Sequence, residues 1–339
     1  MAFHKSSGSH PQIEEVSPVA AIPGGEFRIR GKGLQRGERP SARIGEMAAH
    51  VIVGSDSLMI VRVPEGARPG ELRLGDNGTV WNCAIGVRIA DGLHPVSNPA
   101  VDALGNTYAT FSGSAGQKTP VAIFKIDPQG TSKPLVTDMM NATGLAFDRD
   151  GTLYASSRND GVVYQVSPSG TLAPYVEGMG VATGIVFDNE ENLYVGDRSG
   201  TVFKISRERQ IYVFATLEPS IAAYHLAFGP GGYLYVTGPT ISSFDTVHRI
   251  GSDGQVEPFY RGLGRPQGMA FDAEGNLYVA ASLAGRRGVV RIGPDAHAEL
   301  FLSGPAIVGL AFSPSRSLML ATANAVYRVD VNIAGRPLP

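Results

Sequence analysis

A short pattern recurs six times in the second part of the chain, and this repetition limits the possible folds more than any other feature. Clear copies read GLAFDRDGTLY, GIVFDNEENLY and GMAFDAEGNLY, and a fourth, HLAFGPGGYLY, begins with a histidine. Two further copies match the pattern less closely. The six copies start at residues 98, 144, 184, 225, 268 and 309. Because successive starts are 40 to 46 residues apart, each copy is one structural unit of a repeat protein.

Each copy contains four short strands separated by turn residues. An apolar run such as Leu145-Ala146-Phe147 precedes an Asp and a glycine-containing turn, and a second strand carries Leu153-Tyr154. The copy continues with a third strand and a glycine turn, and it finishes with a fourth strand that ends in an aromatic residue, as at Tyr175. Four strands in about 40 residues are typical of a propeller blade. One blade cannot bury both of its faces, so the six copies predict a six-bladed β-propeller in which the aromatic residues pack between blades.

The last copy has three clear strands, up to Val329, so a fourth strand must come from elsewhere. Residues 90–102 align without a gap to 260–272, which places Ala84–Ala90 where a fourth strand belongs, just before the first copy. We predict that Ala84–Ala90 completes the last blade and leaves no open edge. The alternative is that Val331–Arg336 does so and that Ala84–Ala90 belongs wholly to the first domain.

The first part of the chain does not repeat and is predicted to be a separate small domain. Segments expected to be short strands, such as Glu26–Arg30 and Leu58–Val63, alternate with turns rich in Gly and Pro, which suggests a small β-sandwich. The expected fold class is therefore all-β, an N-terminal β-sandwich followed by a six-bladed β-propeller, and the resemblance given below implies that the sandwich is an immunoglobulin-like β-sandwich. The expected parts are a disordered tail (1–10), the sandwich (11–83) and the propeller (84–339).

Two family resemblances rest on these motifs. The segment from Gly268 to Val279, GMAFDAEGNLYV, resembles NHL-repeat propellers and the related gluconolactonase- and regucalcin-like propellers. The N-terminal part resembles an immunoglobulin-like IPT/TIG domain, with PQIEEVSP from Pro11 and PGGEF from Pro23 as its signature segments. Such domains mediate contacts or act as spacers, so the second resemblance implies an adaptor.

The overall charge and the single cysteine exclude several classes of function. Lys and Arg total 29 and Asp and Glu total 31, so the net charge is −2 and there is no basic surplus for nucleic acid or anionic lipid. Cys83 alone excludes an internal disulfide framework and a multi-thiolate zinc site. No stretch approaches about 18 consecutive apolar residues, and the N-terminus has no apolar run. We expect no membrane partner, no visible signal peptide and, by default, a cytoplasmic location.

A propeller presents its ligand at one mouth of its central channel. We place the site where the chain leads into the first strand of each copy and leaves the second strand. The residues predicted to bind a small molecule or a protein partner there are Thr143, Arg158, Thr183, Asp197, Arg198, His225 and Gln267. Among them, His225 replaces the glycine of the repeat in a single copy.

The resemblance to gluconolactonase-like propellers implies a divalent metal such as calcium, held in the channel by a Glu, two Asn and an Asp. Calcium would polarise a lactone carbonyl there. At the matching positions the chain carries Thr143, Thr183, Tyr224-His225 and Gln267. The usual ligands are not matched, so we predict no cofactor, and the alternative is a divalent metal such as calcium held by other groups.

Two functional hypotheses follow. The first is a binding or interaction protein that holds a ligand or partner at the channel mouth and uses the N-terminal domain as an adaptor. The alternative is an enzyme of the gluconolactonase-like class, either a hydrolase of lactones or esters or a lyase. Its remodelled site would lie around His225, Asp197 and Arg158, with no catalytic residue assigned.

Overall fold

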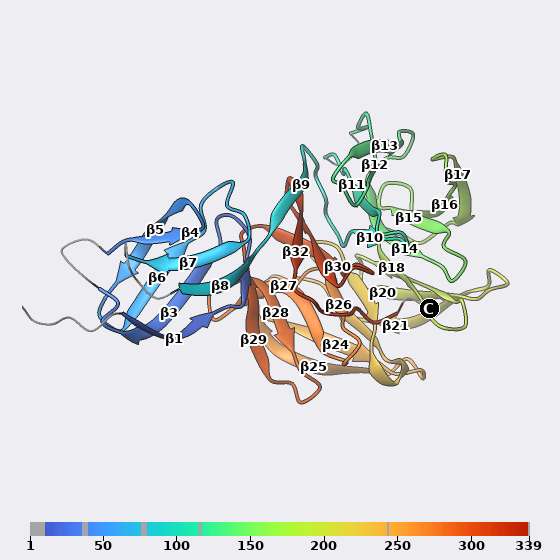
Figure 1. Cartoon of the computed structure of the whole chain (residues 1–339). Coiled ribbons are helices and arrows are strands. Elements are labelled where there is room, and N and C mark those ends of the chain that lie inside the picture. The colour runs from blue at the N-terminus through green and yellow to red at the C-terminus, as the bar shows by residue number, and fades with distance from the viewer. Residues whose placement is uncertain (1–10, 36–39, 76–79, 115–116, 243, 338–339) are drawn as a thin grey trace, which may run out of the picture. The chain divides into compact units, whose positions relative to one another are not determined.

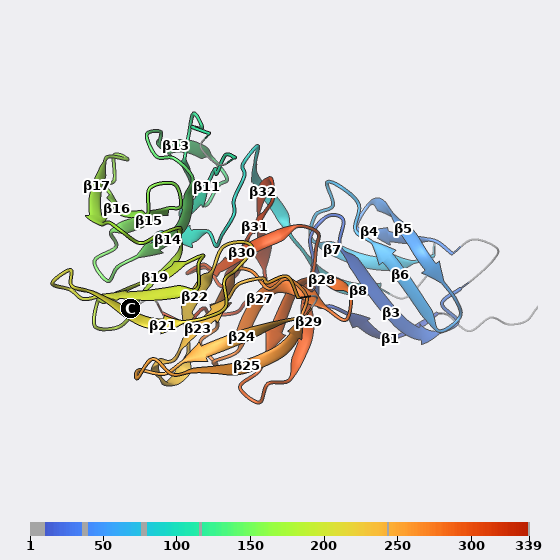
Figure 2. The same ribbon diagram turned by 180° about the vertical axis from the view of Figure 1, so that it is seen from behind.

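The computed structural model describes residues 11–35, 40–75, 80–114, 117–242 and 244–337 (Figures 1 and 2). These residues form strands, and a 3₁₀ turn at Pro230–Gly232 is the one helical element among them. The all-β prediction is confirmed. The chain divides into two compact units. Unit 1 contains the residues up to Val87 and Phe301–Pro305, and unit 2 contains Arg88–Leu300 and the residues from Ala306 onward.

Unit 1 is built from eight N-terminal strands. In hydrogen-bonded order they are β1 (Gln12–Ser17), β3 (Glu26–Lys32), β6 (Leu58–Arg62), β5 (Met47–Gly54), β4 (Ala42–Ile44), β7 (Gly70–Leu74), β8 (Val80–Ile85) and β2 (Ala20–Ala21). Alternate residues of β3 and β6 face the core, where Phe27 pairs with Val61 and Ile29 with Met59. Cys83 is also buried, and burial raises the pKa of its thiol to about 12. The expected tail, residues 1–10, lies outside the described residues.

Unit 2 is a β-propeller of small antiparallel sheets. Three of them are β10 (Ala100–Val101), β11 (Thr107–Thr110), β12 (Ile123–Ile126) and β13 (Ser132–Val136); β14 (Ala142–Phe147), β15 (Leu153–Ser157), β16 (Val162–Val166) and β17 (Leu172–Val176); and β18 (Ala182–Phe187), β19 (Leu193–Asp197), β20 (Thr201–Ile205) and β21 (Ile211–Thr216). The next is β22 (His225–Phe228), β23 (Leu234–Thr237), β24 (Asp245–Ile250) and β25 (Val256–Leu263). The strands β26 (Met269–Phe271), β27 (Leu277–Leu283), β28 (Arg286–Ile292) and β29 (Ala298–Ser303) pair in the same order but are not a separate four-stranded sheet, and the last residues of β29, from Phe301, are assigned to unit 1. The repeat therefore predicts the propeller fold correctly.

The last copy contributes β30 (Ile307–Phe312), β31 (Ser317–Thr322) and β32 (Ala325–Asp330). The fourth strand beside β32 is β9 (Val87–Asp91), which lies upstream of the first copy. Residues 84 and 85 belong instead to β8. The alternative segment, Val331–Arg336, runs along the end of β26, where the Ala273 amide donates to the Ala334 carbonyl at 2.9 Å.

The repeated Tyr and Phe residues join consecutive copies. The Tyr of one second strand packs edge-on against the Phe of the next first strand, the geometry that aromatic pairs prefer. The pairs are Tyr108–Phe147, Tyr154–Phe187, Tyr194–Phe228, Tyr235–Phe271 and Tyr278–Phe312, with ring centroids 4.7 to 5.4 Å apart. The prediction placed the fourth-strand aromatic residues between blades, but Tyr175, Phe214 and Phe259 each pack edge-on against the second-strand Tyr of their own copy, at 5.0 Å between ring centroids.

The repeated Asp caps the turn that follows the first strand. The Asp272 carboxylate accepts hydrogen bonds from the Glu274 amide (3.0 Å) and from the Asn276 amide and side chain (2.8 Å each). It also accepts one from the Tyr278 hydroxyl at 3.2 Å. Asp102 and Asp188 accept equivalent bonds in their own copies. These carboxylates hold the turns and the following strands in place.

Candidate functional site

The first strands of unit 2 surround the channel, which has two ends. We call the end where these strands begin the start mouth, and the end where they reach the capped turns the end mouth. The predicted site residues belong to the start mouth. There the Thr143 hydroxyl donates to the Asn141 carbonyl at 3.0 Å, and the Thr183 hydroxyl donates to the Gly196 carbonyl at 2.8 Å. Both threonines are buried, and their hydroxyls form hydrogen bonds with backbone carbonyls.

The carboxylate and the two guanidinium groups predicted for the site also bind main-chain atoms. Asp197 is buried and accepts hydrogen bonds from the Val181 amide (2.9 Å) and the Ser199 amide (3.2 Å). Arg158 donates to the Gly113 carbonyl at 2.9 Å, and Arg198 donates to a neighbouring loop carbonyl at 3.3 Å. Burial, together with the charge of Arg198, lowers the pKa of Arg158. Among the described residues, no ion pair joins Asp197 to either arginine.

His225 lies at the start of β22 and is 2% exposed. Neither ring nitrogen has a hydrogen-bond partner among the described residues. Burial lowers the pKa of the imidazole to about 4, so the ring is neutral at pH 7. Gln267 is half-buried, and its carbonyl accepts the Thr237 hydroxyl at 2.6 Å.

The glycine of the repeat marks the level at which first strands approach one another most closely. A Cβ atom on Gly184 would lie 2.4 Å from the Tyr224 carbonyl oxygen, and one on Gly309 would lie 2.5 Å from the Ser97 carbonyl oxygen. Two copies carry a larger residue here, His225 and Asn98. The Asn98 amide donates to the Met269 carbonyl at 2.9 Å, and its oxygen accepts the Leu310 amide at 3.0 Å. Asn98 therefore links the first strands of two other copies.

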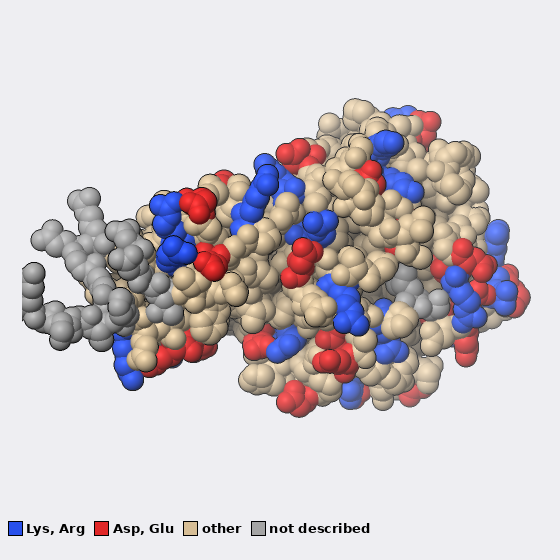
Figure 3. Space-filling model, viewed as in Figure 1, with Lys and Arg blue, Asp and Glu red and all other residues tan. Residues whose placement is uncertain are grey.

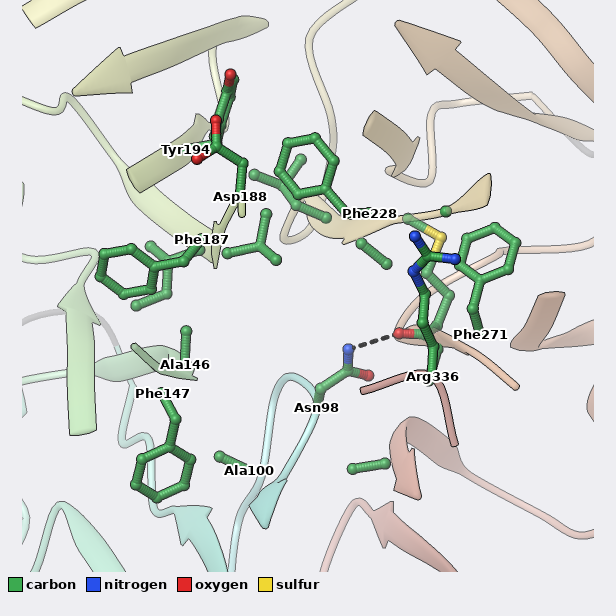
Figure 4. A pocket seen from close by; sticks show the side chains of 18 of the residues that line it. Asn98, Ala100, Ala146, Phe147, Phe187, Asp188, Tyr194, Phe228, Phe271 and Arg336 are labelled. Carbon is green, nitrogen blue, oxygen red and sulfur yellow. Dashed lines mark hydrogen bonds between the residues drawn. The ribbon is translucent and has the colours of Figure 1, made fainter. Parts of the chain in front are cut away.

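A cavity of about 460 Å³ lies toward the end mouth, beyond Asn98. It is lined by the third residue of the pattern, which is small in every copy: Ala100, Ala146, Val186, Ala227, Ala270 and Ala311. Next to these residues stand the repeated phenylalanines, among them Phe147, Phe187, Phe228 and Phe271 (Figure 4). The small side chains leave the space, and the aromatic rings make its surroundings apolar.

Polar residues also line this cavity, among them Asn98, Asp188, Asn189, Glu190, Lys204 and Ser252, and several of these have other partners. The Asp188 carboxylate accepts the Glu190 amide at 2.9 Å and both the amide and the side chain of Asn192. Lys204 Nζ lies 5.5 Å from the ring centre of Tyr194.

Arg336 differs from these groups. Its amide donates to the Phe271 carbonyl at 2.9 Å, and its side chain lines the cavity (Figure 4). In the part of the chain that the structure describes, the Arg336 guanidinium has neither a hydrogen bond nor an ion pair. Arg336 is exposed, so its guanidinium is a cationic group at the cavity that a ligand can reach.

None of the seven residues predicted to bind the ligand lines this cavity. The sequence favours the start mouth because the loops there carry most of the polar residues. The sequence feature that corresponds to the cavity is the small residue at the third position of the pattern. Only that position predicts free space in the channel.

The start mouth does not fit calcium, which takes carboxylate, carbonyl and water oxygens. Its threonine hydroxyls and the Asp197 carboxylate already hold the backbone. Within the described ranges, no three His, Cys, Asp or Glu side chains are grouped as metal ligands would be.

On the face drawn in Figure 3, acidic and basic side chains are intermixed. No helix among the described residues is long and apolar enough to cross a membrane.

Comparison with known proteins identifies the fold class. No protein-family model and no curated protein matches the sequence. Solved structures do match. A putative gluconolactonase is 20% identical over 75% of this chain and 94% of its own, with a TM-score of 0.61. An auxiliary nutrient binding protein from Bacteroides thetaiotaomicron is 11% identical over 95% and 98%, with a TM-score of 0.56.

A third similar structure is a catalytically inactive virginiamycin B lyase from Staphylococcus aureus with quinupristin. It is 13% identical over 85% of this chain and 94% of its own, with a TM-score of 0.52. At these identities the similarity shows a shared fold alone. The chain is a β-propeller protein whose structural neighbours include binding proteins and enzymes.

Proposed function

We propose that this chain is a binding protein that holds a small molecule in the cavity of the propeller channel. The observation that carries the proposal is the 460 Å³ space lined by the small third residues of the repeat. Small-molecule sites are mostly apolar cavities of about 300–1,000 Å³ with a few polar groups. The cavity fits a ligand with an apolar body. The structural similarity to an auxiliary nutrient binding protein is consistent with this function.

The ligand is proposed to carry an anionic group. Arg336 is held at the cavity through its backbone, while its guanidinium has no partner among the described residues. A guanidinium forms strong, paired hydrogen bonds with carboxylate, sulfonate and phosphate oxygens. The ligand class is therefore an apolar molecule with one acidic end, and no metal is needed to hold it.

The alternative function, a gluconolactonase-like hydrolase or a lyase, has less support. It needs His225, Asp197 and Arg158 to act on one substrate. His225 is buried without a partner among the described residues, Asp197 caps a loop, and none of the three lines the cavity. These placements favour binding over catalysis.

The proposal is tested with 1-anilinonaphthalene-8-sulfonate, a fluorescent anion with an apolar body. We expect saturable binding to the folded protein at about one site per chain. Ala146→Trp fills the cavity and should abolish binding. Arg336→Gln removes the cation and should weaken binding about tenfold, because a charge-assisted hydrogen bond contributes about 1.5–3 kcal/mol.

The matched control is Arg265→Gln, an exposed arginine that does not line the cavity. It should leave probe binding unchanged. Near-ultraviolet circular dichroism checks that each variant keeps its tertiary packing. Probe binding that survives Ala146→Trp in a folded protein would rule out the cavity as the site. Turnover of a lactone or ester panel that depends on His225 would favour the enzyme instead.

We further propose six blades and an immunoglobulin-like adaptor of the IPT/TIG type. The run β26–β29 has the repeat pattern and strand order of the other blades, and β30–β32 with β9 has four strands, which supports a count of six. The antiparallel strands and common core of unit 1 support a sandwich.

A further inference from the structure

The fourth strand of each blade is an edge strand, and several blades carry a residue that blocks this edge. Pro134, Pro174 and Pro258 occupy the same register position, opposite Phe124, Tyr164 and His248 of the third strand. Proline has no amide hydrogen, so it cannot donate to an added strand. Natural sheets use proline and charged residues in this way to prevent edge-to-edge pairing.

The edge of β21 lacks this protection. Val213 stands opposite Phe203, at the register position where the three other blades carry proline. The preceding position, occupied by Lys133 and Glu257 in β13 and β25, is Tyr212 here. The exposed fractions of Ile211, Tyr212 and Val213 are 47%, 50% and 66%. We call these three residues the β21 edge.

The register also indicates which way the backbone of this edge points. Proline is tolerated within a strand where its nitrogen faces away from the neighbouring strand. The equivalent nitrogen of Val213 therefore faces away from β20, and so does that of Ile211, two residues earlier. The β21 edge presents backbone donors and acceptors together with apolar side chains, which is the surface that β-strand addition uses.

We propose that the β21 edge pairs with the β21 edge of a second copy of this chain, as antiparallel strands. Centring the pair on Tyr212 sets Ile211 of one copy opposite Val213 of the other, so that their outward backbone groups can exchange hydrogen bonds. The two Tyr212 rings then face each other as a cross-strand aromatic pair.

The sequence of the strand favours a second copy of this chain as the partner that binds the β21 edge. Residues 210–217, QIYVFATL, carry no charge, so antiparallel self-pairing sets no like charges opposite one another. The nearest cation along the chain, Arg209, lies over the Tyr175 ring of its own chain at 4.9 Å, and Lys204, opposite Tyr212 in β20, lies over the Tyr194 ring at 5.5 Å. A single pair of strands buries less than the ~1,200–2,000 Å² of stable interfaces, so the dimer should be weak and reversible.

The test is sedimentation equilibrium of the full chain from low to several hundred micromolar. We expect a monomer–dimer equilibrium. Val213→Pro introduces the residue that three other blades accept at this position, so it should preserve the fold. It should raise the dimer dissociation constant at least tenfold. Tyr212→Lys, which introduces the residue that β13 carries at Lys133, is a second variant with the same expected effect.

The control is Ile241→Ser, which removes a loop side chain that is 90% exposed and lies outside the β21 edge. It should leave the equilibrium unchanged. A strict monomer at every concentration would overturn the proposal. So would a dimer that persists in folded Val213→Pro and Tyr212→Lys, or one that Ile241→Ser abolishes equally. If Val213→Pro loses its near-ultraviolet circular dichroism, Tyr212→Lys alone decides. The dimer proposal does not depend on probe binding in the cavity.

Discussion

His225 shows how one residue can depart from a repeat at an energetic cost. Its counterparts Gly144, Gly184, Gly268 and Gly309 allow close backbone contact, whereas His225 buries an imidazole with no partner among the described residues. Burying a polar group without a hydrogen bond costs free energy, and protonating it there would cost more. A function at this position would explain the cost, but the cavity lies elsewhere.

The first prediction concerns pH. Burial lowers the pKa of His225 from 6.5 to about 4. Between these values the unfolded chain binds a proton that the folded protein does not, so the free energy of unfolding decreases as the pH falls through this window. The decrease should reach up to about 3 kcal/mol. Urea denaturation at pH 7 and pH 4.5 should show a smaller loss for His225→Leu than for the parent protein. An equal loss in both would contradict the prediction.

The second prediction concerns the turn cap. Asp272→Ala removes the acceptor for the Asn276 side chain and for the buried Tyr278 hydroxyl. Losing these hydrogen bonds, one of them buried, should lower the free energy of unfolding by about 2–4 kcal/mol. Asp295 caps an exposed turn through the His297 amide and is the matched control. Asp295→Ala should cost under about 1 kcal/mol in the same denaturation assay. Similar losses in both variants would argue against the buried cap.

At the scale of strands, the sequence predicts more of the fold than of the site. Pattern and spacing identify the propeller strands and the Asp turns, because these depend on local residue type. The cavity depends on the summed volumes of residues such as Ala146 and Ala270, and on where the segment that carries Arg336 lies. That segment follows β32 yet runs along β26. Nothing in the local sequence of Val331–Arg336 indicates this position.

The third prediction tests that segment. A Cβ atom on Gly335 would lie 2.4 Å from the Cβ of Phe312. Gly335→Val should therefore displace the segment, withdraw Arg336 from the cavity and weaken binding of the anilinonaphthalene probe about tenfold. Thermal unfolding should change little, because the residues concerned are only partly buried. Unchanged probe affinity would mean that Arg336 does not contribute to binding.

For the propeller as a whole, closure of the ring depends on β9. This strand comes before the first copy and pairs with β32 of the last, so it joins the two ends of the repeat array. Ile89 packs against a cluster that contains Leu93, Ala109, Ile126 and Val326. Copies from both ends of the array therefore share one small core.

The fourth prediction tests this closure. Ile89→Asp puts a charge into the shared core and should lower the free energy of unfolding by about 2–4 kcal/mol. Arg88→Gln changes an exposed residue of the same strand and should cost under about 1 kcal/mol. Denaturant unfolding of both variants gives the comparison. Equal effects would show that the Ile89 side chain is not needed for closure.

The edge-on Tyr–Phe pairs also bear on how such a chain can change its length. Each of the four middle copies brings a Tyr for the copy after it and a Phe for the copy before it, whereas the first copy has Val101 in place of the Phe and the last has Met319 in place of the Tyr. A duplicated or deleted gene segment of one full period would therefore recreate compatible junctions on both sides. Related chains could therefore gain or lose whole copies more easily than parts of a copy. The number of copies would then be limited by how many blades can close into a ring, and not by the Tyr–Phe contacts between them.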